Sequence, residues 1–275
     1  MLAQAARDLL PPVSHDESIA ITKLRSLSSP NLAPASQRPF RSPHHSSTLS
    51  NLIGSKLSLL PGEISLAHHG VLFLDEFPEF SSQAIEALRT PLETKQITLC
   101  HANTKITYPA DFILIAAMNP CPCGYHNTGV RSCNCTPHQL YKYQKKLSGP
   151  ILDRIDMTVQ LQAIDASVLL KTTTNSTRQD ASAKTAIARA YHAQTQRYHS
   201  PAITNAALNS VSVCERLKLS PSARQLLNEA SAKLQLSARA YFQTIKIAQT
   251  IADLDAVPII DAPQIAEALR YRRPF

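Results

Sequence analysis

The sequence of 275 residues has no tryptophan and is poor in aromatic residues, glycine and long apolar runs. Aromatic residues make up 5% of the chain, which argues against a platform that stacks the bases of a single strand. No apolar run approaches the roughly 20 residues of a membrane-spanning helix, and no basic segment followed by an apolar stretch marks a signal peptide. We therefore expect a cytoplasmic protein without a membrane partner.

The six Gly residues are scattered, and no Gly-Lys pair occurs. A Gly-rich loop ending in Gly-Lys-Ser/Thr before a helix is the usual cradle for nucleotide phosphates, so the sequence contains no Walker A loop. Asp and Glu are also outnumbered by Lys and Arg, which gives a formal net charge of +8. That balance favours a polyanionic partner, either nucleic acid or nucleotide phosphates, although a generally basic protein would show it too.

The stretch 70–76 reads Gly-Val-Leu-Phe-Leu-Asp-Glu, an apolar run that ends in two adjacent carboxylates. A run without alternation is typical of a parallel strand covered on both faces. Two acids at its end are costly to bury unless a cation lies beside them. The pattern predicts a Walker B motif, with Asp75 holding Mg²⁺ through water and Glu76 orienting the attacking water. The alternative is a core strand that runs into an acidic, solvated turn.

A second apolar run, over residues 111–120, ends in Ala-Ala-Met-Asn-Pro. Pro120 stops the strand and leaves the amide of Asn119 exposed beside the acids of the first strand. A side-chain amide there can hydrogen-bond a γ-phosphate or the attacking water without competing for Mg²⁺. We therefore expect Asn119 to be a sensor 1 residue, although a strand-terminal Asn in a turn is also a common structural device.

Four of the six Cys residues form two Cys-x-Cys pairs close together in the sequence. Disulfides are rare in a reducing cytosol, so the spacing favours metal binding. Two such pairs can supply four thiolates to one tetrahedral, structural Zn²⁺, which would brace Asn119. The alternative is a set of reduced thiols in a flexible loop, and His126 and His138 are substitute ligands. The expected ligands are Cys121, Cys123, Cys133 and Cys135.

Two segments carry clustered basic side chains that are candidates for contacts with nucleic-acid phosphates. A solvated surface is at least as good an interpretation of each. The first segment is the stretch 37–45 together with Lys56, and its basic residues are Arg38, Arg41 and Lys56. The basic residues of the second segment are Lys142, Lys145 and Lys146.

Local patterns also predict secondary structure around these motifs. Residues 28–62, rich in Ser, Pro, Asn and His, are expected to form a long irregular loop. A helix is expected over 81–92, capped by Ser81 or Ser82. A hairpin is expected over 96–109, with its turn at His-Ala-Asn-Thr.

The runs RPFRSPHHSS, PGEISLAHHGVLFLDEFPEF, NPCPCG and LSGPILDRIDM, in this order, resemble the Mg-chelatase-like AAA+ ATPases of the ComM/YifB family. The resemblance covers essentially the whole chain. It implies binding of ATP and Mg²⁺ and assembly of a homo-oligomeric, hexameric ring around single-stranded or branched DNA. It also implies a role in branch migration of recombination intermediates, notably in natural transformation.

The resemblance assigns roles to individual residues. Asp75 and Glu76 match the Walker B pair, and Asn119 matches sensor 1. Arg154 falls where the family has its arginine finger, whose delocalised guanidinium stabilises charge on the γ-phosphate of the neighbouring subunit. Arg239 matches the sensor 2 arginine of the lid. Without the resemblance, Arg239 would be a helix-surface residue.

Without the resemblance, the simplest interpretation of Arg154 is an ion pair with Asp153 or Asp156. In the lid, Gln243 and Gln249 stand where the family commonly has Arg, which weakens the expected grip on nucleotide.

The implied fold is an α/β AAA+ P-loop-type αβα sandwich followed by an all-α helical lid. We expect the core over residues 1–165, a polar linker over 166–180 and the lid over 181–275. In the family, the Walker A loop, on a central strand of the sheet, and a Lon-protease-like domain come before the part matched by Met1. We therefore interpret the chain as an N-terminally truncated family member and expect negligible ATPase activity from it alone.

Three other functions compete with this one. A magnesium-chelatase ATPase subunit, which inserts metal into a tetrapyrrole, shares the core motifs, but the Cys-x-Cys pairs and the Pro-His-His stretch favour the first interpretation. A non-catalytic, Zn-stabilised DNA-binding subunit that joins intact rings is the alternative outside the enzymes, and its Arg154 would still serve a neighbouring site. An MCM-type helicase shares the strand and its acids, but the remaining motifs fit it less well.

Overall fold

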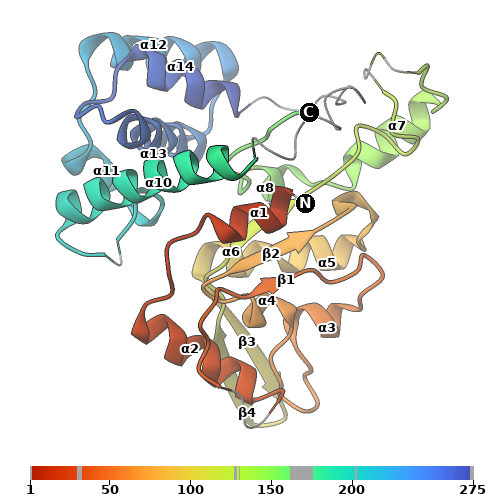
Figure 1. Ribbon diagram of the computed structural model, residues 1–275. Helices are drawn as coiled ribbons and strands as arrows, with labels where there is room; N and C mark the ends of the chain where they lie inside the picture. The colour runs from red at the N-terminus through yellow and green to blue at the C-terminus, as the bar shows by residue number, and fades with distance from the viewer. Residues whose placement is uncertain are drawn as a thin grey trace. The chain divides into compact units, whose positions relative to one another are not determined.

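The computed structural model describes residues 2–29, 33–126, 129, 131–161, 176–201 and 203–272, with the backbone alone for 176–180 (Figure 1). The chain divides into two compact units, residues 1–154 and 155–275. No helix in these described ranges is long and apolar enough to cross a membrane. Most of the expected 166–180 linker lies outside the described residues.

A three-stranded parallel sheet forms the centre of the first unit. Its strands are β1 (Phe40–Arg41), β2 (Val71–Leu74) and β5 (Ile113–Ala116), in the order β1-β2-β5. β2 lies in the middle, and Leu72 and Leu74 are almost fully buried. The run of apolar residues that predicted a strand covered on both faces is therefore confirmed for β2.

The second apolar strand differs from its prediction. β5 covers only four residues of the expected 111–120 strand, with the two end residues exposed and the two middle residues half-buried. Ile113 is 47% exposed. Among the described residues, only β2 pairs with β5, so β5 is an edge strand of this sheet. An edge position explains why an apolar sequence is not buried on both faces.

Helices surround this sheet, and a separate antiparallel hairpin lies beside them (Figure 1). The hairpin pairs β3 (Gln96–His101) with β4 (Thr104–Pro109), which confirms the predicted hairpin with a tighter turn. The helices are α1 (Leu2–Asp8), α2 (His15–Ser26), α3 (Leu49–Ile53), α4 (Glu63–Leu66), α5 (Ser82–Ala87), α6 (Arg89–Thr94), α7 (Pro137–Lys145) and α8 (Gly149–Leu152), with a 3₁₀ turn, η1, at Phe77–Glu79.

Two local predictions need correction. The segment 28–62 is not one irregular loop, because it contains β1 and α3. The helix expected over 81–92 is two short helices that meet at Leu88. Its cap is Ser81, whose hydroxyl accepts a hydrogen bond from the backbone N–H of Ala84 at 3.2 Å.

A close backbone contact holds β1 against the start of β2. The backbone N–H of Val71 donates to the carbonyl oxygen of Pro39 at 2.8 Å. A Cβ atom added to Gly70 would lie 2.0 Å from that same oxygen. The glycine that opens the apolar run is therefore required by the approach of β1.

The second unit is helical in its described part. Its long helix α13 (Ala238–Asp255) packs against α10 (Ser176–Tyr198), α11 (Ser210–Arg216), α14 (Ala262–Arg270) and the 3₁₀ turn η2 (Asn205–Ala207), while α12 (Pro221–Leu234) packs against α14 (Figure 1). α10 begins inside the expected linker, so the helical region starts earlier than the expected 181.

A buried ion pair ties this unit together. The carboxylate of Asp253 accepts hydrogen bonds from Arg197 and Asn205 and from the amide of Gln249, the last at 3.0 Å. Gln249 is only 2% exposed. Its side chain is therefore committed to the helical core, and the weakened grip on a nucleotide stays a prediction.

Candidate functional site

The acids after β2 and the amide after β5 leave the sheet at the same edge. In the parallel register Leu74 pairs with Ala116. Beyond the strands, the N–H of Ala117 donates to the oxygen of Leu74, and the N–H of Phe77 donates to the oxygen of Ala117, both at 2.9 Å. The segments that carry Asp75–Glu76 and Met118–Asn119 therefore leave the two paired strands at the same end.

Both carboxylates at this edge are exposed. The argument that a cation must compensate buried charge is therefore wrong for Asp75 and Glu76, because water reaches both. Their turn is nonetheless well defined. An oxygen of Asp75 accepts a hydrogen bond from the N–H of Glu76 at 3.0 Å, and Glu76 has left-handed backbone angles, with φ 51° and ψ 45°. The η1 turn follows at once.

A histidine that the sequence analysis did not single out contacts one of these acids. Nδ1 of His45 lies 3.0 Å from a carboxylate oxygen of Glu76. The ring of His44 packs on that of His45 with centroids 4.1 Å apart, and Nδ1 of His44 is 2.8 Å from the hydroxyl of Ser46. The only sequence signal was the Pro-His-His run, which lies far from the acids along the chain.

Tyr143 connects helix α7 to the same edge. Its hydroxyl donates to the backbone oxygen of Asn119 at 3.1 Å, and the side chain is buried. Burial raises the pKa of Tyr143, and the negative charges of Glu79, Cys121 and Glu76 raise it further. Lys146, just after α7, also forms an ion pair with Glu79 of the η1 turn, at 3.1 Å. The end of β5 is thus fixed by side chains outside the sheet.

The two candidate arginines are each engaged within their own unit. Arg154 pairs with Glu93 and is only 10% exposed. The partner is therefore not Asp153 or Asp156, as the local sequence had suggested. Arg239 lies in the first turn of α13, where it is half-buried and interacts electrostatically with Asp156.

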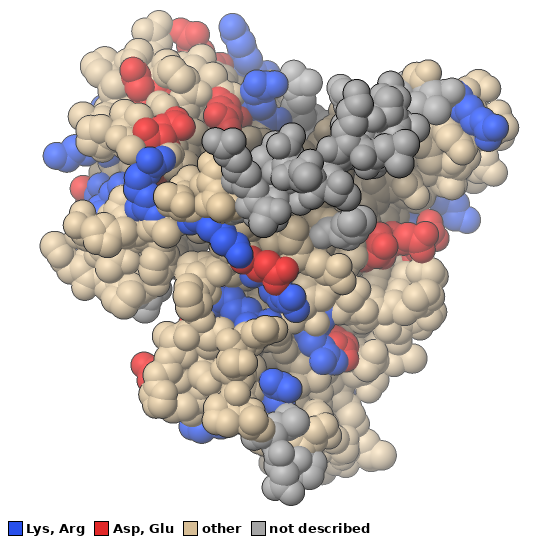
Figure 2. Space-filling model, viewed as in Figure 1, with Lys and Arg blue, Asp and Glu red and all other residues tan. Residues whose placement is uncertain are grey.

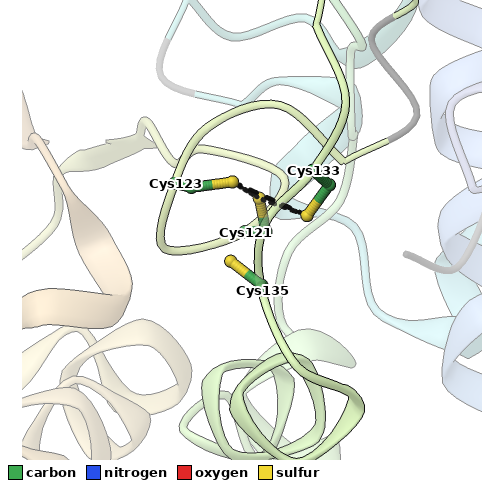
Figure 3. Close-up of side chains that lie close together, drawn as sticks. All are labelled: Cys121, Cys123, Cys133 and Cys135. Carbon is green, nitrogen blue, oxygen red and sulfur yellow. Dashed lines mark hydrogen bonds between the residues drawn. The ribbon is translucent and has the colours of Figure 1, made fainter.

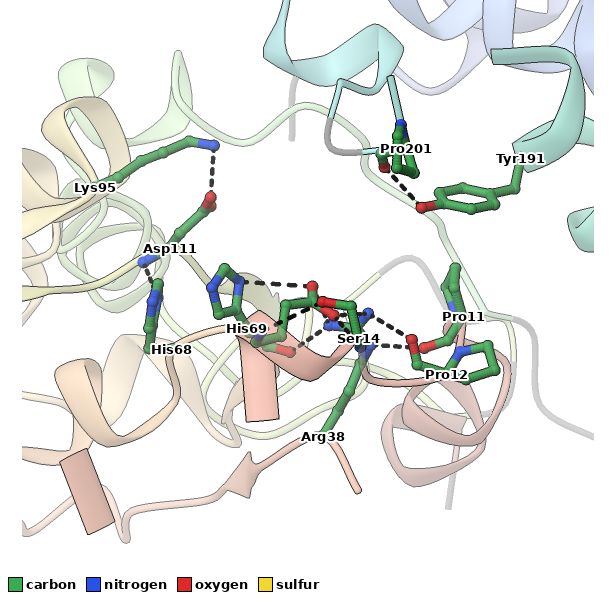
Figure 4. A network of polar contacts seen from close by, with 11 residues as sticks. Pro11, Pro12, Ser14, Arg38, His68, His69, Lys95, Asp111, Tyr191 and Pro201 are labelled. Atoms are coloured by element: carbon green, nitrogen blue, oxygen red, sulfur yellow. Dashed lines mark hydrogen bonds and ion pairs between the residues drawn. The ribbon is translucent and has the colours of Figure 1, made fainter. Parts of the chain in front are cut away.

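The first basic segment serves the fold. All five N–H donors of Arg38 are used: Glu17 accepts two at 3.0 Å, and the backbone oxygens of Pro11, Pro12 and His69 accept the others (Figure 4). The guanidinium of Arg41 is engaged in the same way by the carboxylate of Glu63. Arg38 and Arg41 are therefore engaged within the unit, whereas Lys56 is exposed, and contacts of this segment with nucleic-acid phosphates stay a prediction.

The four predicted cysteines converge on one point (Figure 3). Their sulfur atoms all lie within 4.8 Å of one another. The Sγ atom of Cys121 is 3.3 Å from that of Cys123 and 3.8 Å from that of Cys133. A tetrahedral Zn²⁺ with Zn–S bonds near 2.3 Å requires sulfurs about 3.8 Å apart, so the donor set and its spacing fit one metal ion.

The backbone around the cluster also suits metal binding. The N–H groups of Tyr125 and Asn134 donate to the sulfur of Cys123, and together with Cys121 they lower the pKa of Cys123 to about 6, whereas burial and the neighbouring sulfurs raise the pKa of Cys135. A thiolate is the form that binds metal. Cys121, two residues after Asn119, is fully buried. Neither His126 nor His138 belongs to the cluster, which needs no substitute ligand.

Comparisons with known proteins cover nearly the whole chain. The family model described as magnesium chelatase, subunit ChlI, matches residues 1–169, and the model of the C-terminal part of that subunit matches residues 177–272. The YifB protein of Escherichia coli and the competence protein ComM of Haemophilus influenzae are each 40% identical over 274 residues. The Mb2921c protein of Mycobacterium bovis is 37% identical over 277 residues.

These alignments cover 99% of this chain and 53 or 54% of the relatives. The chain thus spans about half the length of the curated relatives that it matches.

Proposed function

Because this chain belongs to the magnesium chelatase subunit ChlI family, we propose that it is the ATPase module of a ring-forming protein that remodels DNA. Its similarity to the competence protein ComM supports a role in the handling of incoming or recombining DNA. One observation carries the proposal: the acids Asp75 and Glu76 and the amide of Asn119 leave the parallel sheet at one edge. Carboxylate oxygens beside an amide are suited to Mg²⁺, water and phosphate.

The residues at this edge divide the work of hydrolysis. Asp75 would hold Mg²⁺, which would supply positive charge beside the phosphates. Glu76 would orient the attacking water and accept the proton that this water loses as it attacks. The contact with His45 holds the Glu76 carboxylate in position. The Asn119 amide donates to the water or the γ-phosphate, and Tyr143 keeps the Asn119 backbone in place.

Arg154 acts on a neighbouring subunit in this proposal. Its guanidinium is paired with Glu93 here, so it must exchange Glu93 for a phosphate when a ring forms. Arg239 contributes from the helical region as the sensor 2 residue.

The four cysteines hold a structural Zn²⁺ in this proposal. We expect about one equivalent of zinc per chain by elemental analysis. Cys123→Ser should lose the metal, whereas Cys214→Ser, an exposed cysteine outside the cluster, should retain it. Equal metal content in both variants would argue that the sulfurs are free thiols.

The phosphate cradle is the part that these 275 residues do not contain, since no Gly-Lys pair occurs. We therefore propose that the chain by itself does not hydrolyse ATP and contributes Arg154 to a site completed elsewhere. This is the non-catalytic, ring-joining function, and the absence of a Gly-Lys pair favours it over independent turnover.

Mixing this chain with an intact ComM-type protein tests both parts. We expect no turnover from the chain alone. In the mixture, the chain should change the ATPase rate. The Arg154→Ala variant of the chain should alter that effect, whereas the control variant Arg89→Ala, at an exposed arginine of the same unit, should not. Turnover by the chain alone that Glu76→Gln abolishes would contradict the inactivity. Stimulation by a tetrapyrrole instead of DNA would favour a magnesium-chelatase subunit.

A further inference from the structure

Helix α7 has two unlike faces. Tyr143, and Leu147 just beyond the helix, are buried against the rest of the first unit. On another face lie the exposed side chains of His138, Tyr141, Lys142 and Lys145. Their spacing of three, four and seven residues places them in one stripe along the helix. We call these four residues the α7 stripe.

The α7 stripe exposes an aromatic ring with a cation on it. Tyr141 is 62% exposed, and the Nζ atom of Lys145 lies 5.5 Å from the centre of its ring. An exposed tyrosine gains nothing from burial, so the core does not explain its place here. A flat ring beside a mobile ammonium is the arrangement with which proteins stack a base and neutralise the adjoining phosphate.

The cysteine loop before α7 repeats this arrangement. Tyr125 is 36% exposed, and the guanidinium of Arg131 lies 5.8 Å from the centre of its ring. Tyr125 follows Cys123 by two residues, and α7 begins two residues after Cys135. Because the sulfurs of Cys123 and Cys135 belong to one cluster, that cluster holds the loop and the start of the helix together.

The charge of this part of the chain is of one sign. Residues 112–152 contain no Asp or Glu, whereas they contain Arg131, Lys142, Lys145 and Lys146. Lys146 is paired with Glu79, which lies outside this segment. In Figure 2 the projection at the upper right, which contains α7, carries blue groups at its outer edge. A segment without carboxylates of its own is complementary to a polyanion.

We propose that the α7 stripe and the Tyr125–Arg131 pair form a binding surface for single-stranded nucleic acid. Bases stack on Tyr141 and Tyr125, and phosphates contact Lys142, Lys145 and Arg131. The low aromatic content of the whole chain concealed this surface, because two rings suffice when both are exposed and flanked by cations. The surface is separate from the acidic edge of the sheet and shares with the proposed function only the nature of the partner.

A binding measurement without ATP tests this surface independently of hydrolysis. The probe is a fluorescein-labelled oligothymidylate about 16 nucleotides long, within the range that such surfaces cover, and the signal is its anisotropy with the zinc-loaded chain. Tyr141→Leu should weaken binding about fivefold or more, and Tyr141→Phe should not, because phenylalanine keeps the stacking face. The affinity for a duplex of matched length should be unchanged by Tyr141→Leu.

The lysines are tested by the salt dependence of the same binding. The double variant Lys142→Gln/Lys145→Gln should reduce the slope of log K against log[salt] by about 1.4, or about 0.7 for each lost phosphate contact. The control is Lys23→Gln/Lys105→Gln, which removes two exposed lysines from α2 and β4 and should leave the slope unchanged. Zinc content and melting temperature, measured for every variant, show that metal and fold are retained.

Four results would overturn the proposal. The first is equal slopes in the two double variants. The second is equal affinity of Tyr141→Leu and Tyr141→Phe, which would mean that the ring does not stack. The third is polyglutamate that competes with the oligonucleotide at equal charge, which would make the surface a site for an acidic polypeptide. Loss of zinc from the Lys142→Gln/Lys145→Gln variant would also overturn it, because those cations would then merely balance thiolate charge.

Discussion

At the scale of single residues, the most perturbed histidine lies away from the proposed catalytic edge. His68 is only 7% exposed, and its Nδ1 atom accepts a hydrogen bond from the backbone N–H of Asp111 at 3.1 Å (Figure 4). Burial, and then the neighbouring charge of His69, lower the pKa of His68 from 6.5 to about 4. The folded chain therefore keeps this imidazole neutral.

This histidine makes stability depend on pH in a defined direction. Above pH 6.5, the pKa of this histidine in the unfolded chain, its contribution to stability is fully present. The contribution is lost as the pH falls towards about 4, because over this range only the unfolded state takes up the proton. Between about pH 7 and pH 5 the expected loss is about 2 kcal/mol. Urea unfolding at the two pH values measures it. His68→Asn keeps an acceptor and should remove most of the loss, so an unchanged pH dependence would assign it to other groups.

Some residue roles could be predicted from the sequence, and others could not. The adjacent acids and the clustered cysteines were visible because each motif is contiguous or closely spaced. The contact of His45 with Glu76, and the pairs that engage Arg38 and Arg154, were not, since each joins residues that are far apart in the chain. Such contacts depend on how β1, β2 and the helices pack, which no local pattern encodes.

At the scale of elements, the cap of α5 gives a sharp test. The sequence left Ser81 and Ser82 as equal candidates, and the structure places the accepting hydroxyl on Ser81. We expect Ser81→Ala to lower the free energy of unfolding by about 1 kcal/mol. Ser82→Ala, one residue later in the helix, should change it by only a few tenths. The reverse order in thermal or urea unfolding would mean that the helix begins elsewhere.

The accuracy of the element predictions followed the strength of each pattern. β2 and the β3–β4 hairpin have a run or an alternation long enough to recognise. β1 has only two residues, too few to show a periodic pattern, and it lies in a segment rich in Ser and Pro, so no strand was predicted there. The burial of β5 was overestimated because an apolar run predicts a strand but not its neighbours in the sheet.

At the scale of the whole molecule, the division into units could not be placed from composition. The polar stretch after residue 165 suggested a boundary there, whereas the chain divides between Arg154 and Ile155. The reason is long-range hydrogen bonding: the N–H of Thr158 donates to the oxygen of Tyr271 at 2.8 Å, and Arg272 donates to the oxygen of Ile155. Residues after 154 are thus tied to the chain's far end.

Two separate cores predict separate responses to mutation. Asp253, with a side chain only 1% exposed, pairs with Arg197. Asp253→Ala should destabilise the second unit by about 3–5 kcal/mol, because it leaves the arginine without its charge partner. Hydrogen exchange should then accelerate in α10 and α13 and stay unchanged in β2 and β5. The double variant Arg197→Met/Asp253→Leu should recover only part of the loss, because the amides of Asn205 and Gln249 still lack their acceptor. Faster exchange in both units alike would indicate one cooperative core.

The close approach of Pro39 to Gly70 sets a limit on how this protein can vary. In a saturation library screened for correctly folded chains, position 70 should accept glycine alone, because any side chain would force β1 away from β2. Position 149, whose added Cβ would meet open space, should accept many residues. The glycine that opens the acidic motif is therefore fixed by a neighbouring carbonyl oxygen, so selection for the fold alone would retain it whatever becomes of the acids that follow.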